Sequence, residues 1–549
     1  MPTLLPIATL LAAQTSLSHY WHKLTDPTFR NVYHVNAFDL AMMIPYFLVL
    51  FVLAAYGLHR YWLVYDYYVY SKNVPGPPPE IKHWPRVTVQ LPIFNERYVI
   101  ERLVEAVSRF DYPRELLDVQ VLDDSTDETC QVASACVERH AAQGMPIVYI
   151  HRTNREGYKA GALENGLKTS QGEFIAIFDA DFIPEPDFLR RTIPYFVAPS
   201  DSPHDSSQIG MVQTRWTYLN RDYSLLTQVE TILLDGHFVV EHGARSRRGT
   251  FFNFNGTAGV WRRKAIEDAG GWEHDTLTED TDLSYRAQLK GWKFLYLPQI
   301  ECASELPVDM NGFKAQQARW AKGLMQTAKK ILPRVWRSDA PWHVKAEAFF
   351  HLTANISYPL MVLFSAMLLP AMIVRFYQGW FQMLVIDLPL FLASTCSISS
   401  FYLVAQRELR PKSWWTTFLY MPFVMATGIG ISVRNAQAVM EAIIGKKSEF
   451  ARTPKFNIEG KKGSFAGKKY KNKAGWMPYA EVILGLYFAG TIVYAIMNEN
   501  YATIPFLLLF VWGYLYTGLM SLGQTYFAHL RFDVNAPEMR PAATGAPGF

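Results

Sequence analysis

Apolar and polar positions divide the chain of 549 residues into a polar centre and strongly apolar flanks. Nearly uncharged apolar runs occur at 40–57, 348–374, 380–404, 481–497 and 501–528. A helix needs about 20 mostly apolar residues to cross the hydrocarbon core of a bilayer. The pattern therefore predicts an integral, multi-pass membrane protein with about five spanning helices and a large polar domain.

The segment 414–445 is apolar in its first half and amphipathic in its second half. Between Arg434 and Lys473 the chain carries eleven Lys or Arg residues against three Glu. Basic loops next to membrane helices face the cytoplasm. The polar domain is also expected there, because it carries the nucleotide-binding signals described below. We therefore expect 414–445 to lie along or dip into the cytoplasmic face of the membrane.

Three apolar strands of the polar centre end in acidic residues, and helices are expected between them. Alternating strands and helices of this kind predict a doubly wound α/β sheet. Ligands of such sheets bind beyond the carboxyl ends of the strands. We expect one crevice there, flanked by Glu96, Asp123, Asp124, Asp179 and Asp181.

The sequence Asp179-Ala180-Asp181 follows the strand expected at 174–178. Two carboxylates at this spacing suit Mg²⁺ or Mn²⁺, which bind oxygen ligands and bridge phosphate oxygens. Acidic residues in a turn also cap helices without any ligand, so that interpretation stays open. Lys159 lies where a Gly-containing turn opens a helix. A lysine at a helix N-terminus can bind phosphate, but an ordinary exposed lysine fits the same position.

The second half of the polar centre adds a small-residue segment and an acidic turn. Asn255 and Gly256 belong to a run of small residues that would let the backbone approach a sugar closely. Thr278-Glu279-Asp280 precedes a predicted helix, where a carboxylate suits either a general base or an N-cap. An N-cap explains one acidic residue, but this turn has three, Glu279, Asp280 and Asp282.

Gln316, Arg319 and Trp320 fall on one face if their segment is helical. An amide, a guanidinium and an indole together can bind a sugar, the ring by stacking and the polar groups by hydrogen bonds. An amphipathic helix at a membrane interface favours the same residue types.

Charge and cysteine content exclude some functions. The formal net charge of +4 is too small to indicate nucleic-acid binding. The four cysteines have no CxxC pattern and no metal-ligand spacing, so reduced thiols are expected rather than disulfides or a zinc site.

With these motifs assembled, residues 86–475 resemble the processive family 2 glycosyltransferases, which include cellulose, hyaluronan and chitin synthases. Their D, DxD, TED and QxxRW series matches Asp123/Asp124, 179–181, 278–280 and 316–320. The strings "GYKAGAL", "IFDADFIPEPDFL" and "FNGTAGVWR" look most like the cellulose-synthase-like A and C branch, which makes glucomannan and xyloglucan backbones. The resemblance implies a GT-A type catalytic domain inserted in an α-helical transmembrane domain.

The resemblance also implies roles for the site residues. Asp280 would be the catalytic base, positioned by Glu279 and Thr278. Asp181, helped by Asp179, would bind Mg²⁺ or Mn²⁺. The acceptor would meet Trp320, Gln316, Asn255 and Gly256. The nucleotide sugar would be held by Phe94, Glu96, Asp123, Asp124, Lys159, Asp179 and Arg319.

"FARTPK" (450–455) looks like the FxVTxK gating loop of cellulose synthases. Phe450, Thr453 and Lys455 match that pattern, whereas Arg452 replaces the usual Val and Pro454 stiffens the loop. A basic stretch held against anionic lipid is an alternative that is compatible with gating.

The implied function is inverting, processive transfer that polymerises a β-1,4-linked glucan, mannan or glucomannan from a nucleotide sugar and moves it across the membrane. UDP-glucose is the favoured donor, with GDP-mannose also consistent; the partners are the growing polysaccharide and membrane lipid. A bacterial inner membrane is predicted. Transfer to a lipid, as in ceramide or dolichyl-phosphate glucosyltransferases, and an inert scaffold are the alternatives.

The expected domains follow from these assignments. They are an N-terminal segment, 1–85, with a membrane helix at about 38–58; a catalytic domain, 86–330; membrane helices and the interfacial segment, 331–445; a gating-loop segment, 446–477; and a closing helix pair with the tail, 478–549.

Overall fold

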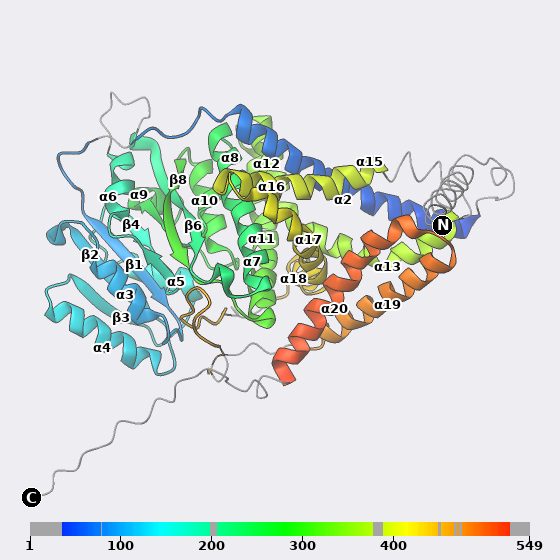
Figure 1. Cartoon of the computed structure of the whole chain (residues 1–549). Coiled ribbons are helices and arrows are strands. Elements are labelled where there is room, and N and C mark those ends of the chain that lie inside the picture. Colours follow the sequence, from blue (N-terminus) through cyan, green and yellow to red (C-terminus); the bar gives the residue numbers. More distant parts are fainter. Residues whose placement is uncertain are drawn as a thin grey trace, which may run out of the picture.

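The structure is a computed structural model that describes residues 36–77, 80–197, 206–376, 388–447, 452–465, 468, 470 and 475–526. Its polar region is built on one mixed sheet in the order β3-β2-β1-β4-β7-β6-β8-β5 (Figure 1). The strands are β1 Val87–Ile93, β2 Leu117–Asp123, β3 Ile147–His151, β4 Phe174–Ile177, β5 Phe182–Pro184, β6 Ile209–Tyr218, β7 Gly259–Arg262 and β8 Lys293–Ser304.

The strands predicted from the acidic ends are confirmed as β1, β2 and β4. These three are parallel neighbours, with β1 between β2 and β4. β4 then pairs antiparallel with β7, while β6 and β8 run parallel to each other. Because the carboxyl ends of β1, β2 and β4 meet at one edge of the sheet, the residues that follow them are brought close together.

Helices cover both faces of the sheet, as a doubly wound fold requires. One face packs against α3 Ile100–Ser108, α4 Thr129–Ala142 and α6 Phe188–Thr192 in a core that includes Val89, Leu103 and Val137. The other packs against α5 Tyr158–Leu167, α9 Arg263–Asp268 and α10 Glu279–Leu289. Strands such as β1 are buried along their whole length, which explains their continuous apolar run.

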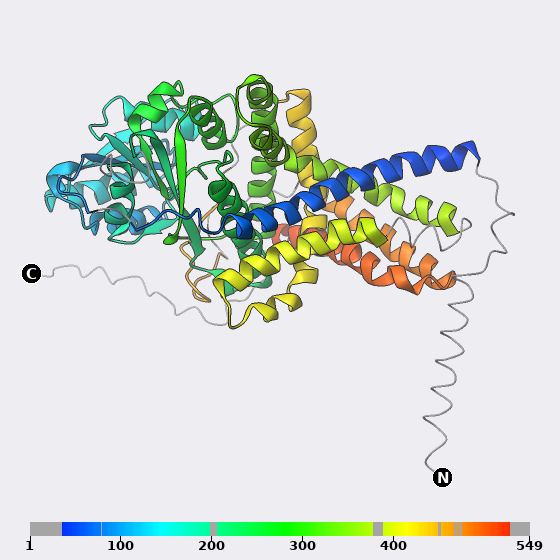
Figure 2. The same ribbon diagram turned by 90° about the horizontal axis from the view of Figure 1, so that it is seen from above.

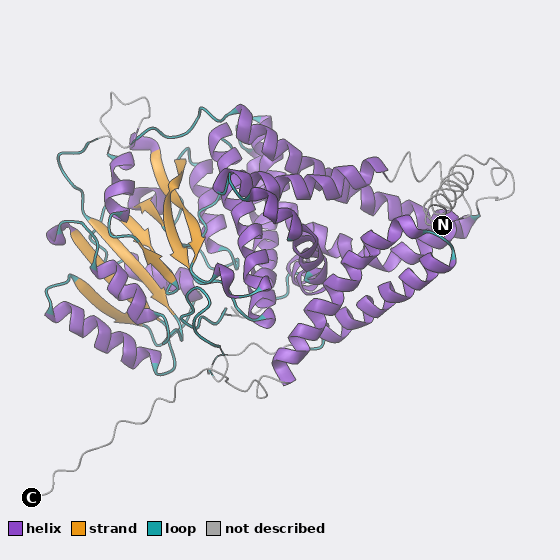
Figure 3. Ribbon diagram, viewed as in Figure 1, coloured by secondary structure: helices purple, strands orange, loops and turns teal. Residues whose placement is uncertain are grey.

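Most of the remaining helices extend away from the strands and form the other half of the molecule, although α8 Gly243–Arg248 contacts β8 (Figures 2 and 3). They are α2 Ala37–Val69, α7 Leu225–Asp235, α8 Gly243–Arg248, α11 Met310–Arg337, α12 Trp342–Thr353, α13 Ser357–Phe376, α15 Leu388–Phe391, α16 Ser397–Leu409, α17 Met421–Gly430, α18 Ser432–Ile444, α19 Met477–Met497 and α20 Ile504–Tyr526. A π-helix, Gly236–His242, follows α7.

Four helical stretches of the described residues are long and apolar enough to cross a membrane: Ala37–Val69, Trp342–Val374, Met477–Met497 and Tyr501–Tyr526. They correspond to four of the five predicted spans. The fifth, 380–404, begins outside the described residues and continues as α15, a π-turn and α16. α17, with 10 residues, is shorter than a spanning helix, and it packs against α20 rather than standing alone.

α11 joins the two halves of the molecule. Its Asp309 N-cap accepts the backbone N–H of Gly312 at 2.7 Å. Lys314 donates to Glu481 of α19 at 2.6 Å, and Lys322 donates to Glu441 of α18 at 2.8 Å. The helix that carries the QxxRW residues is therefore anchored at two points, one on the candidate membrane span α19 and one on the shorter helix α18.

Candidate active site

A cavity of about 170 Å³ opens beyond the carboxyl ends of β1, β2 and β4, at the predicted crevice. It lies between the sheet and α11, and the loop 452–458 closes one side of it. Sixteen of the predicted site residues line it: Phe94, Glu96, Asp124, Lys159, Asp179, Asp181, Asn255, Gly256, Thr278, Glu279, Asp280, Gln316, Arg319, Trp320, Thr453 and Lys455. Segments far apart in the sequence thus meet in one place.

Two lysines balance the carboxylates at the end of β4. Lys159, in the first turn of α5, donates to Asp179 Oδ1 at 2.5 Å and to the Gly256 carbonyl at 2.9 Å. Burial lowers the pKa of Lys159, but the charges of Asp179 and Glu279 raise it more, so the net shift is upward. The Lys455 ammonium lies 2.8 Å from Asp181 Oδ2.

The carboxylates here nevertheless crowd one another. Burial raises the pKa of Glu96 to about 7, and the charges of Asp181 and Asp179 add to that rise against the opposing charge of Arg452. Burial also raises the pKa of Asp179, where Asp181 contributes again. These crowded carboxylate oxygens are ligands of the type that a hard divalent cation such as Mg²⁺ or Mn²⁺ prefers.

The acidic turn lies at the start of α10, as predicted. Its first residue is Glu279, and Thr278 precedes it without a side-chain cap; the Thr278 hydroxyl pairs with Thr327 of α11 at 3.0 Å. Asp280 Oδ1 accepts the Thr281 N–H at 2.7 Å. Burial and then the charge of Glu279 raise the pKa of Asp280 to about 7. Asp280 is therefore poised to exchange a proton near neutral pH.

Gly256 brings the backbone against this carboxylate. Its φ of +80° is a conformation that L side chains rarely adopt, and a Cβ there would lie 3.0 Å from Asp280 Oδ2. The neighbouring Asn255 Oδ1 contacts His237 Nε2 at 2.9 Å, and Asn255 Nδ2 contacts His242 Nε2 at 2.8 Å. The π-helix Gly236–His242 supplies both histidines and so holds this strip of backbone in place.

α11 supplies the wall opposite the sheet. Gln316, Arg319 and Trp320 are half-buried on one face of it, and all three line the cavity. Burial lowers the pKa of Arg319, and the charges of Glu279, Asp179 and Asp280 oppose that shift. The guanidinium thus lies among the carboxylates of both acidic motifs.

Asp124 and Phe94 line the far end of the cavity. Arg152 holds Asp124 through two bonds, from Nε to Oδ1 at 2.8 Å and from Nη2 to Oδ2 at 2.5 Å. The Arg155 guanidinium lies over the Phe94 ring, 3.4 Å from its centroid. A flat cation on an aromatic ring makes a surface on which a nucleobase can stack.

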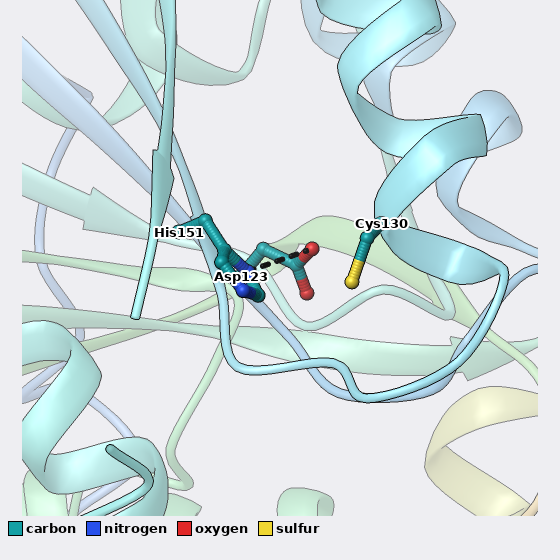
Figure 4. Close-up of side chains that lie close together, drawn as sticks. All are labelled: Asp123, Cys130 and His151. Carbon is teal, nitrogen blue, oxygen red and sulfur yellow. Dashed lines mark ion pairs between the residues drawn. The ribbon is translucent and has the colours of Figure 1, made fainter. Parts of the chain in front are cut away.

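Asp123 does not line the cavity, so its predicted contact with the nucleotide sugar is not supported by the geometry. It ends β2, and side chains alternate along a strand, so Asp123 and Asp124 point in different directions. The Tyr149 hydroxyl donates to Asp123 Oδ2 at 2.6 Å, and the Ser125 N–H donates to Oδ1 at 2.8 Å. Figure 4 shows the carboxylate beside Cys130 and His151.

The loop 452–458 carries the predicted gating residues Thr453 and Lys455 into the cavity wall; Phe450 lies outside the described residues. Glu305 anchors this loop, because it accepts the N–H groups of Phe456 at 2.7 Å and Ile458 at 3.2 Å. Arg452, the residue that departs from the gating pattern, donates to the Asn95 carbonyl.

Three charged lining residues were missed by the motif search: Glu305, Arg155 and Arg452. Glu305 directly follows β8, so the rule that ligands gather at strand ends could have found it. Arg155 precedes the Lys159 motif by four residues. Arg452 could be noticed only as a departure from the loop pattern, because its contact depends on the tertiary structure.

Comparisons with known proteins find similarity to glycosyltransferases. Residues 85–323 match the family model described as glycosyltransferase like family 2. The chain is 44% identical over 312 residues to glucomannan 4-beta-mannosyltransferase 1 of Oryza sativa subsp. japonica, covering 55% of this chain and 58% of the relative. It is 46% identical over 260 residues to glucomannan 4-beta-mannosyltransferase 2 of Arabidopsis thaliana, covering 47% of each. The chain thus spans about half the length of these relatives.

Among solved structures, the chain is similar to the mannosyltransferase PcManGT from Pyrobaculum calidifontis in complex with GDP-Man and Mn²⁺. The identity is 22% and the TM-score 0.45, over 66% of this chain and 99% of that one.

The family match and the mixed sheet confirm the predicted GT-A type glycosyltransferase fold of the polar region, beside a helical membrane region. The similarity to the cellulose-synthase-like A branch is supported by the two plant relatives. Neither of them supports the prediction of a bacterial source.

Proposed function

We propose that the chain is a membrane-embedded, inverting glycosyltransferase that extends a β-1,4-linked mannan or glucomannan processively from GDP-mannose. The observation that carries the proposal is the position of Asp280, whose carboxylate lines the cavity directly beside the Gly256 backbone. Burial and the charge of Glu279 raise its pKa to about 7, which suits proton transfer. The names of the two plant relatives support mannosyl transfer. GDP-mannose therefore replaces UDP-glucose as the favoured donor.

Asp280 acts as the general base. It accepts the proton of the acceptor 4-hydroxyl while that oxygen attacks the anomeric carbon of the donor sugar and the bond to the nucleotide diphosphate breaks. Attack from the side opposite the leaving group inverts the anomeric carbon. Glu279 keeps the Asp280 pKa high by its charge, and the Thr281 N–H fixes one carboxylate oxygen.

The leaving diphosphate is stabilised by the cationic groups of the cavity. Lys159 lies between Asp179 and the Gly256 carbonyl, near the N-terminus of α5, and Arg319 reaches towards the same carboxylates. Asp181 and Asp179 would hold a divalent cation, Mg²⁺ or Mn²⁺, which when bound neutralises charge on the diphosphate. The loop 452–458 lies beside this site and would shield it from water.

Trp320 and Gln316 bind the terminal sugar of the acceptor, the indole by stacking and the amide by hydrogen bonds. α11, which carries both, is anchored to α18 and α19, so the acceptor end lies next to the membrane helices. This placement supports translocation of the growing polymer through the membrane region. By the basic loop argument, the catalytic domain faces the cytoplasm.

The experiment incubates membranes containing the chain with Mn²⁺ and either GDP-[¹⁴C]mannose or UDP-[¹⁴C]glucose, then separates label into insoluble polymer and lipid extract. We expect polymer label from GDP-mannose, and an Asp280→Asn variant that incorporates none. Polymer label from UDP-glucose alone would overturn the donor assignment.

A lipid acceptor is the second candidate, favoured only by the contact between α11 and the membrane helices. Label found only in the lipid extract would establish it and reject processive polymer synthesis.

A further inference from the structure

Outside the cavity, two groups of side chains among the described residues bring together three metal-ligating atoms within 4.8 Å of one another. One comprises Glu273, Asp275 and Asp282. The Lys330 ammonium contacts each of its carboxylates, at 2.5, 2.7 and 3.1 Å, so their charge is already neutralised. The other group is Asp123, Cys130 and His151, which offers a carboxylate, a thiol and an imidazole instead of three carboxylates.

Asp123, Cys130 and His151 come from three separate elements. Asp123 ends β2 and His151 ends β3, and these two residues are partners in the parallel register. Cys130 stands in the first turn of α4. His151 Nδ1 lies 3.6 Å from Asp123 Oδ2, and Figure 4 shows the Cys130 sulfur turned towards the same carboxylate.

These distances suit a metal ion. Zn²⁺ binds nitrogen and oxygen at roughly 2.0–2.2 Å and sulfur at roughly 2.3 Å, so tetrahedral ligands stand roughly 3.3–3.8 Å apart. The Asp123–His151 separation of 3.6 Å already falls in that range. The cysteine, within 4.8 Å, needs only a small shift.

The surroundings resemble a supported metal site. Tyr149 donates to Asp123 Oδ2 and the Ser125 N–H donates to Oδ1, so the carboxylate is oriented by its neighbours, as outer hydrogen bonds orient metal ligands. Asp123 is fully buried, whereas the His151 side chain is 34% exposed and gives an ion a way in. Among ion pairs of the described residues, Asp123 has His151 as its partner and no lysine or arginine.

We propose that Asp123, Cys130 and His151 form a binding site for a borderline-soft divalent cation of the Zn²⁺ class, with a fourth position open to water. A thiolate, an imidazole and a carboxylate select such an ion over Mg²⁺, which prefers oxygen alone. Binding displaces the thiol proton, which Cys130 now donates to the Ser125 carbonyl at 3.1 Å, and releases it to solvent.

The cysteine spacing predicts no zinc site, and the structure shows why it could not. The three ligands are 7 and 21 residues apart and are brought together only by the pairing of β2 with β3 and by the start of α4. The site also borders the donor end of the cavity, because Asp123 and His151 adjoin the paired residues Asp124 and Arg152. The proposal does not depend on the transferase function.

The test uses the full chain in detergent, stripped of metal by a chelator and kept in excess Mg²⁺ to occupy hard-cation sites. Co²⁺ is the probe, because thiolate ligation gives it a charge-transfer band in the near ultraviolet. We expect the band at one Co²⁺ per chain and its loss on adding Zn²⁺. Cys130→Ser abolishes the band, while Cys136→Ser, on the same helix, retains it.

Zn²⁺ affinity, measured by competition with a chromophoric chelator, gives a second readout. His151→Gln changes an exposed side chain and should weaken Zn²⁺ binding by about tenfold or more. No band in the unmodified chain, a band that survives Cys130→Ser, or Zn²⁺ affinity unchanged in His151→Gln would each overturn the site; the last two would show adventitious metal binding only.

Discussion

Two of the three acidic side chains in the first turn of α10, Asp280 and Asp282, have opposite surroundings. Asp282 points to the buried side, where Arg286 donates to it at 2.8 Å and Lys330 lies 3.1 Å away. Asp280, two residues earlier, lines the cavity, and its pKa is raised to about 7 by burial and by Glu279. Two aspartates of one helical turn thus have different electrostatic surroundings. The charge of Asp282 is neutralised by two cations, whereas the charge of Asp280 is opposed by the neighbouring Glu279.

The difference separates structure from chemistry. A buried carboxylate paired with two cations, as Asp282 is, contributes to the fold. A buried carboxylate whose charge is opposed by another carboxylate is costly for the fold, and such costs gather at functional sites. Under the proposed function, the acidic cluster therefore contains Asp282 for stability and Asp280 for proton transfer.

The largest expected effect is at the cavity. Asp280→Asn removes the proposed general base while keeping the side-chain shape, so mannosyl transfer should fall by about 10²–10⁴-fold. Binding of GDP-mannose, measured by isothermal titration, should stay within about threefold of the unmodified chain. A loss of donor binding equal to the loss of transfer would instead place Asp280 in nucleotide recognition.

Asp282→Asn tests the other face of the same turn. It leaves Arg286 and Lys330 without a buried counter-charge, so the free energy of unfolding should fall by about 3 kcal/mol. Thermal unfolding followed by tryptophan fluorescence would show a lower midpoint, with transfer per folded molecule little changed. Equal stability in Asp282→Asn and the unmodified chain would contradict the structural role.

The pH dependence of transfer sharpens the comparison. Burial raises the pKa of Asp280 to about 7, so the base is protonated and inactive below that pH and active above it. In kcat/KM, which reports the pKa of the free chain, transfer should fall by about tenfold per pH unit below 7. The Asp282→Asn variant should show the same fall in rate below pH 7.

Glu96 is the matched control for this profile, because burial also raises its pKa to about 7. If the fall in rate below pH 7 persists in the Glu96→Gln variant, the fall is assigned to the titration of Asp280. A fall that disappears in Glu96→Gln would contradict that assignment.

A smaller effect is expected at Lys455, which pairs with Asp181 at 2.8 Å. Lys455→Met removes a cation that competes for this buried carboxylate, so Mn²⁺ should bind more tightly than to the unmodified chain. Mn²⁺ binding is followed by electron paramagnetic resonance of the free ion. Lys461→Met, an exposed lysine of the same basic stretch, should change nothing; weaker binding in Lys455→Met would show that Asp181 is not a ligand.

The local patterns predict much of the fold. The continuous apolar run of β1, the acidic ends of β2 and β4, and four of the membrane spans follow from periodicity and length. Those patterns are local, because burial on both faces of a strand or contact with lipid requires apolar residues at successive positions of the sequence.

Side-chain direction and long-range contacts could not be predicted in the same way. Adjacent acids such as Asp123 and Asp124 point to different surroundings, and only the packed structure shows that the former meets Tyr149. Glu305 becomes important only when the loop 452–458 folds over it. The split between Asp280 and Asp282 likewise depends on Lys330, nearly 50 residues away along the chain.

The central claim is most directly tested by digesting the polymer that membranes make from GDP-[¹⁴C]mannose. The account predicts that an endo-β-1,4-mannanase releases the label as soluble oligosaccharides, that a β-1,4-glucanase does not release it from a pure mannan, and that Asp280→Asn membranes give no polymer. Polymer formed equally well by Asp280→Asn membranes, or polymer resistant to the mannanase, would contradict it.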